Sequence, residues 1–190
     1  MKIALLGYGK MGKTIEALAV EKRHQIAATF NSAAPPNASD LQGLDVCIEF
    51  STPQAAMKNI LTCFEAGVPV VVGTTAWYDE LETMRSELKR NNGSIFYASN
   101  FSLGVHLFWQ ANRFLAKLMG EHQEYLSSIH EIHHIEKKDA PSGTAITTAE
   151  EMIKHHPKLE NWNENSCPKL GSINISHDRL EDVKGTHIVS

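Results

Sequence analysis

The residues most suited to chemistry are gathered in one segment, residues 131–145, which reads EIHHIEKKDAPSGTA. His133, His134 and Lys137 lie close enough in the sequence to hold a substrate carboxylate or to deliver protons to a reducing centre. Histidines and lysines also occur on ordinary solvated strands. Their density beside a helix-start signal nevertheless favours a catalytic or binding site here.

That helix-start signal follows the histidines directly. Asp139, Ser142 and Thr144 all belong to residue types that cap helix N-termini. The backbone N–H groups around Ser142, Gly143 and Thr144 would form an anion pocket, because the first amides of a helix lack internal partners and the helix dipole favours negative charge. The segment therefore predicts one carboxylate bound at this helix N-terminus and a second one held by the preceding histidines and lysine.

The same segment also satisfies a zinc-binding pattern, H-E-x-x-H, from His130 to His134. On a helix these two side chains would share a face and could chelate one metal ion, whereas on a strand they would stand about 13 Å apart. Ile129, Ile132 and Ile135 recur every three residues, as in a helical stripe, so the pattern alone leaves the conformation open. The parallel sheet expected upstream and the lack of a clear third ligand favour a site without metal.

A second chemical signal lies near the N-terminus, where Gly7-x-Gly9-x-x-Gly12 follows the apolar run 3–6 and opens a segment with helical spacing. In this context the pattern is typical of a dinucleotide-binding turn. The first glycine permits the tight turn, the second lets the backbone approach a pyrophosphate, and the third lets helix and strand pack closely. The sequence predicts NADH or NADPH as the cofactor.

The residues after the second apolar run leave the choice between these cofactors open. An acid there normally binds the ribose 2′-hydroxyl of NAD, and a basic residue favours the phosphate of NADP. This chain has Asn31 and Ser32 at that place, and both are neutral. Lys10 or Lys13 in the first turn of the helix offers an alternative partner for a 2′-phosphate.

Three further motifs follow later apolar runs, at the edge where ligands bind in open α/β sheets. Their small residues, hydroxyls and aromatic rings would suit a nicotinamide ring and its carboxamide, although each motif could also be a simple turn. The three are Phe50-Ser-Thr-Pro53, Gly73-Thr-Thr75 and Ala98-Ser-Asn-Phe101.

Strand-like and helix-like segments alternate through the first part of the chain, which predicts βαβ crossovers and a parallel sheet. We expect strands at 3–6, 26–30, 46–50, 68–72 and 94–98, helices at 54–65 and 78–90, and a loop at 31–39. Farther on, we expect helices at 105–119 and 144–155, strands at 172–176 and 186–189, and an unassigned segment at 124–135. The fold class predicted is α/β, with a doubly wound, Rossmann-type domain over 1–104 and a smaller α/β domain over 105–190.

Composition excludes several classes of function. With 18 Lys and Arg against 22 Asp and Glu, the net charge of -4 supplies no field for binding nucleic acid or an anionic membrane. The three cysteines are too scattered for a disulfide framework, and no apolar run is long enough to span a bilayer. We expect a cytoplasmic protein acting on a small molecule.

The motifs in their order along the chain resemble the dihydrodipicolinate reductase family, whose enzymes reduce 4-hydroxy-tetrahydrodipicolinate with NAD(P)H in lysine and diaminopimelate synthesis. The long segment 131–145 is the most specific of them. The others are Gly7-x-Gly-x-Met-Gly12, Phe50-Ser-x-Pro53, Gly73-Thr-Thr75, Asn100-Phe-Ser-x-Gly-Val105 and Gly185-Thr-His187.

The resemblance implies roles for individual residues. His133 would be the acid/base residue and Lys137 the proton donor. The dicarboxylate substrate would be bound by His134, Ser142, Gly143, Thr144 and Thr75. The cofactor would be surrounded by Gly7, Tyr8, Gly9, Lys10, Met11, Gly12, Asn31, Phe50, Gly73, Thr74, Thr75, Ala98, Ser99, Asn100 and Phe101. The second domain would bind substrate and build a homotetramer, and the two domains would close over the substrate.

Two departures from the family pattern affect these expectations. Asn31 stands where the family usually has an acidic or basic residue, so the nucleotide preference does not carry over. The chain also ends at Ser190, where the family continues through more sheet and a final helix, so we expect the second domain to be truncated. Alternatives are a non-catalytic dinucleotide-binding module and a dehydrogenase of another substrate, such as aspartate or meso-diaminopimelate. The presence of His133 and Lys137 argues against both.

Overall fold

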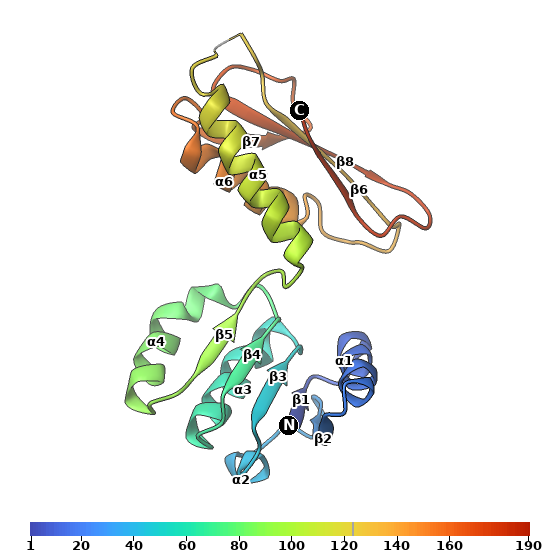
Figure 1. Ribbon diagram of the computed structural model, residues 1–190, viewed down its shortest axis with the longest axis vertical. Coiled ribbons are helices and arrows are strands. Elements are labelled where there is room, and N and C mark those ends of the chain that lie inside the picture. Colours follow the sequence, from blue (N-terminus) through green and yellow to red (C-terminus); the bar gives the residue numbers. More distant parts are fainter. Residues whose placement is uncertain (123) are drawn as a thin grey trace. The chain divides into compact units, whose positions relative to one another are not determined.

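The computed structural model describes residues 1–122 and 124–190, which form two compact units, Met1–Ser99 and Asn100–Ser190 (Figure 1). None of the described helices is both long and apolar enough to cross a lipid bilayer. Each unit has its own sheet.

The first unit is built on a five-stranded parallel sheet with strand order β2-β1-β3-β4-β5. Its strands are short and largely apolar, as suits strands covered on both faces. The order reverses direction at β1, so the loops after β1 and β3 border the crevice where open α/β sheets bind ligands. The strands are β1 (Lys2–Leu6), β2 (Gln25–Phe30), β3 (Val46–Glu49), β4 (Val70–Val72) and β5 (Ile95–Tyr97).

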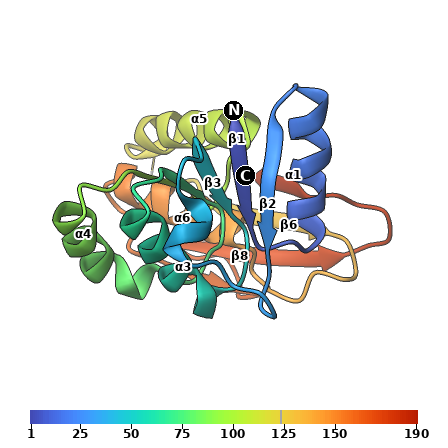
Figure 2. The ribbon, with the colours of Figure 1, turned by 90° about the horizontal axis from the view of Figure 1, so that it is seen from below.

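Helices cover both faces of this sheet, and the alternation of side chains along β1 shows why. Ile3 and Leu5 pack in a cluster with Ala19 of α1, whereas Ala4 and Leu6 join a larger cluster that includes residues of α3. Figure 2 shows α1 and α3 on opposite sides of the strands. The doubly wound, Rossmann-type fold predicted for this part is therefore confirmed. Its helices are α1 (Lys10–Glu21), α2 (Ala38–Leu41), α3 (Pro53–Glu65), the 3-10 turn Tyr78–Glu80 and α4 (Leu81–Arg90).

The second unit is a four-stranded sheet, in the order β7-β8-β6-β9, with two long helices packed on it (Figure 1). Strands β7, β8 and β6 are parallel, and β9 runs antiparallel to β6. The indole N–H of Trp109 on α5 donates to Thr148 Oγ1 on α6 at 3.0 Å, which joins the helices. The elements are α5 (Leu103–Met119), β6 (Ser128–His133), α6 (Gly143–His155), β7 (Asn161–Glu164), β8 (Ser172–Arg179) and β9 (Thr186–Val189).

The structure settles the ambiguous segment 124–135, which contains strand β6. Ile129, Glu131 and His133 are buried, and the residues between them are partly exposed, which is the two-residue period of a strand. Strand β8 extends to Arg179, three residues beyond the expected end. Two short elements, α2 and β7, were not predicted. Apolar periodicity indicates neither element, because turn-forming residues surround α2 and because the sequence of β7, Asn-Trp-Asn-Glu, is mostly polar.

Candidate active site

A buried carboxylate, that of Glu131, begins the predicted catalytic segment 131–145. Its side chain is fully buried, although Glu is among the residue types least often found inside a protein. The backbone N–H of Ser142 donates to both of its oxygens, at 3.0 and 3.2 Å, and Arg179 Nη2 lies 3.3 Å from Oε1. Burial raises the pKa of Glu131, but the hydrogen bonding from Ser142, together with His133 and Arg179, outweighs it and leaves that pKa below its ordinary value.

Two histidines face the same carboxylate. Nδ1 of His133 lies 3.6 Å and Nε2 of His187 lies 3.5 Å from Glu131 Oε2, and the two rings meet edge to face with centroids 5.1 Å apart. Burial lowers the pKa of His133; Glu131 opposes that effect, and Lys137 and Arg179 reinforce it. Burial also lowers the pKa of His187, and His133 adds to the effect. Both imidazoles are therefore predominantly neutral near pH 7.

Ser142 is the N-cap of α6. Of the three candidate caps, Asp139, Ser142 and Thr144, it is therefore the one that caps the helix. Its Oγ accepts a hydrogen bond from the backbone N–H of Ala145 and lies 3.1 Å from His187 Nε2. A side chain at Gly143 would meet no atom within 4 Å, so the start of the helix is open. First-turn amides beside open space, with two histidines and an arginine nearby, suit a carboxylate ligand.

Lys137 lies in the segment between β6 and α6 and is only 20% exposed at its side chain. Its ammonium group donates to both oxygens of Asp139, at 2.8 and 2.7 Å. Arg179 holds the same backbone from the end of β8: its Nη2 donates to the carbonyl of Asp139 at 2.8 Å, and its Nε donates to that of Lys137 at 3.4 Å. The lysine is therefore carried on a loop of defined shape rather than on a free one.

His134 is placed differently from His133. Its side chain lines a cavity of about 490 Å³ with residues 135–136 and 181–184, and its buried Nδ1 has no hydrogen-bond partner among the described residues. Within the described parts of the chain, no side-chain hydrogen bond or ion pair joins His134 to Glu131, His133 or Lys137. Of the predicted substrate-site residues in this unit, the structure thus groups His133, Lys137 and 142–144. His134 follows His133 in the chain, but its side chain faces the separate 490 Å³ cavity.

The zinc pattern H-E-x-x-H does not form a metal site here, because His130 lies on a strand and faces β8. Its Nδ1 is 2.9 Å from Ser176 Oγ and its Nε2 is 3.4 Å from Asp178. A different set of ligand atoms, on Glu131, His133 and His187, lies within 4.8 Å. Because the Ser142 N–H and Arg179 already bind that carboxylate, we describe this group as a polar cluster centred on Glu131.

The glycine turn of the first unit has the geometry that a dinucleotide requires. Gly7 has φ +99, and a Cβ there would lie 2.0 Å from the carbonyl oxygen of Phe50. A Cβ on Gly12 would lie 2.3 Å from the oxygen of Gly7. Helix α1 follows an N-cap, Gly9, that offers no side-chain hydrogen bond, and open space surrounds it. The first amides of α1 are therefore available to a pyrophosphate.

Two cavities in the first unit adjoin this turn, and they share Gly9, Phe50 and Ser51. One, of about 610 Å³, also contains Tyr8, Asn31, Lys58 and Asn59 in its lining. The other, of about 380 Å³, is lined by Gly9, Lys10, Met11, Phe50, Ser51, Pro53, Gly73, Thr74 and Thr75. Most of the predicted cofactor residues are thus brought together, and Thr75, predicted for both ligands, lies with them.

Several polar contacts fix the loops that line these cavities. Ser51 N–H donates to Thr74 Oγ1 at 2.8 Å, and the buried Glu49 carboxylate binds the hydroxyl of Ser51 and the amide of Asn59. A Cβ on Gly73 would lie 2.0 Å from the ring of Phe50, so glycine is required where that ring packs. The edge expected to meet a nicotinamide is therefore rigidly built.

The remaining predicted cofactor residues are more dispersed. Asn31 Oδ1 accepts hydrogen bonds from the backbone N–H groups of Ala33 and Ala34, at 2.9 and 3.1 Å, so this oxygen shapes its own loop. The hydroxyl of Tyr8 binds Glu16. Ala98 and Ser99 follow β5 at the end of the first unit, and Asn100 and Phe101 begin the second one.

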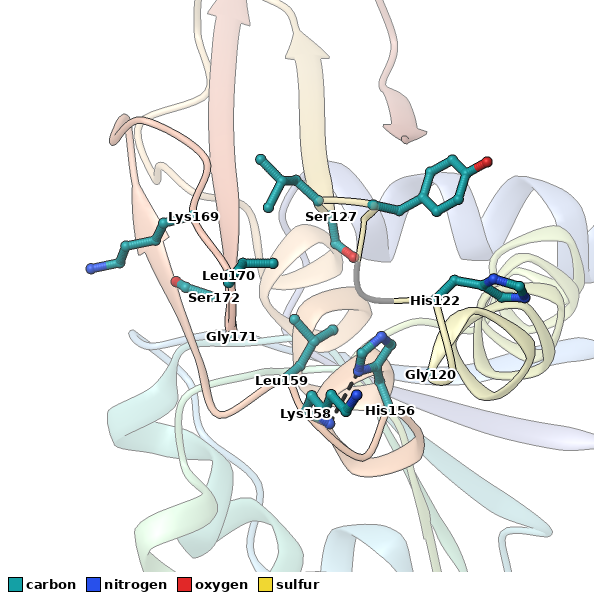
Figure 3. A pocket seen from close by; sticks show the side chains of 12 residues that line it. Gly120, His122, Ser127, His156, Lys158, Leu159, Lys169, Leu170, Gly171 and Ser172 are labelled. Atoms are coloured by element: carbon teal, nitrogen blue, oxygen red, sulfur yellow. Dashed lines mark hydrogen bonds between the residues drawn. The ribbon is translucent and has the colours of Figure 1, made fainter.

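A further pocket of about 90 Å³ lies at the opposite end of β6 (Figure 3). His156 and Lys158 line it, and the Lys158 N–H donates to His156 Nδ1 at 3.2 Å. Ser127, next to the start of β6, lies on its wall, whereas the Glu131 cluster lies toward the end of that strand. None of the predicted site residues lines this pocket.

Comparison with known proteins decides the family. The family model described as dihydrodipicolinate reductase, N-terminus, matches residues 1–101, and the model for the C-terminus matches residues 104–190. The chain belongs to the dihydrodipicolinate reductase family. The resemblance predicted from the motifs is thus confirmed.

Named members of the family align along the whole chain. A 4-hydroxy-tetrahydrodipicolinate reductase of Christiangramia forsetii is 43% identical over 190 residues, covering 100% of this chain and 79% of that protein. One of Archaeoglobus fulgidus is 33% identical and covers 100% and 81%. A dipicolinate-bound dihydrodipicolinate reductase from Paenisporosarcina sp. has the same fold, with a TM-score of 0.74 at 24% identity over 100% of this chain and 82% of that one.

Sequence reasoning missed three members of the candidate site of this dihydrodipicolinate reductase family chain, namely Glu131, Arg179 and His187. Glu131 was recoverable, because on a strand it shares a face with His133, two residues on. His187 stood in a recognised motif, but nothing in the sequence indicated what it would contact. Arg179 carries no local signal, since its role depends on the pairing of β6 with β8.

Proposed function

We propose that this chain reduces 4-hydroxy-tetrahydrodipicolinate to tetrahydrodipicolinate with NADH or NADPH, a step of lysine and diaminopimelate synthesis. The observation that carries the proposal is the cluster around Glu131, which joins His133 to the open N-terminus of α6 beside the loop of Lys137. In the overall balance the substrate gains a hydride and a proton and loses water.

Cofactor binding is assigned to the first unit, with 1–104 as the proposed domain. The open amides after Gly9 and the two adjoining cavities support a pyrophosphate there, with the rest of the dinucleotide on either side. The bound nicotinamide would supply the hydride. The loops ending in Phe50 and Thr75 would orient its ring, because their backbone is held by Ser51, Thr74 and Glu49.

Substrate binding and proton transfer are assigned to the second unit, with 105–190 as the proposed domain. Ser142, Gly143 and Thr144 would hold one carboxylate through the start of α6, and His134 would contribute to the other. Lys137 would donate the proton that completes the reduction, since its ammonium is held on a defined loop. His133 would act as acid/base or supply positive charge; its neutral state without ligand leaves it able to take up a proton when a dicarboxylate arrives.

The first unit would accept both cofactors. Among the residues lining the 610 Å³ cavity there is no carboxylate to repel a 2′-phosphate, and Lys58 is a cation on its wall. The hydroxyl of Ser32 and the carboxamide of Asn31 could serve either ribose. Strong discrimination between NADH and NADPH is therefore not expected.

The protein would act as a cytoplasmic homotetramer. The second sheet supports this assembly, because α5 and α6 cover one of its faces while Ile188 of β9 is 45% exposed. Light scattering after gel filtration would measure the mass directly. A monomer at micromolar concentration would refute the tetramer.

The function is tested with the purified 190-residue chain, by following NADH and NADPH oxidation at 340 nm with substrate generated from pyruvate and aspartate semialdehyde. Substrate-dependent oxidation with either cofactor supports the proposal. Clear nucleotide binding without oxidation, when a characterised relative is active in the same mixture, would instead indicate a non-catalytic binding module.

A further inference from the structure

The carboxylate of Glu131 has contacts that the proposed chemistry does not by itself require. It is buried at the proposed binding site of a dianionic substrate, where its own negative charge would weaken substrate binding. A buried carboxylate persists only where hydrogen bonds and opposite charges compensate its desolvation. Here the compensation comes from the Ser142 amide, from Arg179 and from two histidines, and each of these groups belongs to a different piece of the second unit.

We propose that Glu131 is the positioning residue of the substrate site: its carboxylate holds the Ser142 amide at the start of α6 and fixes the ring orientation and tautomer of His133 and His187. This inference rests on the proposed function, but its first test does not use activity. The arrangement parallels a catalytic dyad, in which a buried carboxylate orients an imidazole and stabilises its protonated form without being protonated itself.

The contacts assign a tautomer to each ring. Nδ1 of His133 is buried, has no hydrogen-bond partner among the described residues, and lies 3.6 Å from Glu131 Oε2. A small tightening on ligand binding would close that gap, because catalytic hydrogen bonds are often long when no ligand is bound. The Nδ1–H tautomer would leave Nε2 of His133 to exchange protons with the substrate. For His187 it is Nε2 that faces two oxygens, Ser142 Oγ at 3.1 Å and Glu131 Oε2 at 3.5 Å, so the Nε2–H tautomer is expected.

The charges around His133 show why the carboxylate matters for proton uptake. The groups that face the ring are Glu131 on its own strand, Lys137 and Asp139 on the following loop, Arg179 on β8, and the neutral His187 on β9. Two carboxylates thus balance two cations. Replacing Glu131 by glutamine would leave a net positive surrounding, and protonation of His133 would then require a lower pH.

The first test is nitrogen NMR of the full, wild-type chain with ¹⁵N-labelled histidine, at a pH where both rings are neutral. The proposal expects the proton of His133 on Nδ1 and that of His187 on Nε2. A His133 with its proton on Nε2 would overturn the proposal, even if the enzyme turns over normally. If the tautomers are as expected but the wild-type assay shows no turnover, the proposed function fails and the positioning role stands.

The second test compares Glu131→Gln, Glu131→Asp and a control, Glu164→Gln. Glu164 is a matched control because its Oε1 lies 3.5 Å from a histidine, His177, in the same sheet but is 40% exposed at its side chain. Glu131→Gln should lower the protonation midpoint of His133 by about one pH unit, move the alkaline limb of kcat/KM the same way and reduce kcat/KM about tenfold or more. Glu131→Asp should keep the midpoint near that of wild type, and Glu164→Gln should change neither quantity.

A purely structural role gives a different result. Glu131→Gln and Glu131→Asp would then lose activity and thermal stability together, with the pH profile in its wild-type position, and this outcome would refute the proposal. If Glu131→Gln does not fold, the wild-type tautomers and the Glu131→Asp profile still decide, because both are measured on proteins that keep the carboxylate.

Discussion

The hydroxyl oxygen of Ser142 lies 3.1 Å from Nε2 of His187, so the cap of helix α6 contacts a residue of β9 that is 45 positions later in the chain. The cap therefore has two functions. It accepts the N–H of Ala145 to start the helix, and it joins the amides proposed to bind substrate to one of the two histidines of the Glu131 cluster.

Ser142→Ala separates these functions when it is compared with Ser102→Ala. Ser102 caps α5 in the same way, accepting the N–H of Val105 at 3.4 Å, but among the described residues no hydrogen bond joins it to His133 or His187. Each substitution should cost about 1 kcal/mol of unfolding free energy. Only Ser142→Ala should raise KM for the dicarboxylate, about tenfold. Chemical denaturation and steady-state kinetics measure the two effects, and equal KM values would remove Ser142 from the substrate site.

Lys137→Ala should reduce kcat at least 100-fold, because the proton donor is lost, while nucleotide affinity stays within about twofold of wild type. The neighbouring, exposed Lys138 provides the control, since Lys138→Ala removes the same charge one residue away. Rapid-quench or steady-state kinetics give kcat, and fluorescence titration gives the affinity for NADH. Equal loss of NADH binding in Lys137→Ala would exclude the assigned role.

Two glycines of the first turn should respond differently to the same change. Gly9→Ala meets no atom within 4 Å, so this variant should keep its melting temperature and yet bind nucleotide at least tenfold more weakly, because the methyl group would face the pyrophosphate. Gly12→Ala places a Cβ 2.3 Å from the oxygen of Gly7 and should lose both stability and binding. Calorimetry and NADH titration distinguish them. Unchanged binding in Gly9→Ala would move the cofactor elsewhere.

Asn31→Asp should convert a permissive nucleotide site into one that prefers NADH. A carboxylate after β2 can bind the ribose hydroxyls and repels a 2′-phosphate, so KM for NADPH should rise about tenfold or more while KM for NADH holds or falls. Asn92→Asp, in an exposed turn of the same unit, is the control for added charge. If Asn31→Asp changes the KM values for NADH and NADPH by the same factor, the adenosine end of the cofactor lies away from β2.

Stability should fall as the solution is acidified, and the direction follows from three groups. Burial holds the pKa values of His133 and His187 below 6.5 in the folded chain. Between these pKa values and 6.5 the unfolded chain binds more protons than the folded one, so the free energy of unfolding decreases as pH falls below about 6.5. The pKa of Glu131 lies below 4.5, so its contribution is full above that value and is lost as pH falls through the folded-state pKa.

Thermal melts between pH 8 and pH 4 test this dependence, and His187→Gln supplies the comparison. The variant lacks one of the two rings that resist protonation, so its melting temperature should fall less steeply between pH 7 and pH 5.5 than that of wild type. A steeper fall in the variant would contradict the assignment of His187 as a buried, neutral ring.

The first unit was largely predictable, and the second one only in part. Apolar runs and glycine spacing are local signals, so the five parallel strands and the turn at Gly7 were correctly inferred, with ends within about two residues. The segment around Ile129, by contrast, fits both a helix of period three and a strand of period two. Pairing with β8 and β9 decides between them, and the pairing residues lie 46 to 60 positions later in the chain, from the pair Ser128 and Asn174 to the pair Ile129 and Val189.

The candidate site follows the same division. His133, Lys137 and Ser142 lie in one continuous segment, and their clustering could be inferred from the sequence. The network that gives them their electrostatic setting could not, because Arg179 and His187 reach Glu131 only through the tertiary fold.

The hydrogen bonds from Arg179 to the carbonyls of Lys137 and Asp139 have a consequence for the order of folding. The loop that carries the lysine is closed by a side chain some 40 residues downstream, and β8 must be paired before that side chain can arrive. Closing so long a loop costs entropy that is repaid only when the sheet is complete. We therefore expect the loop that carries Lys137 to reach its final conformation only after β8 has paired with β6.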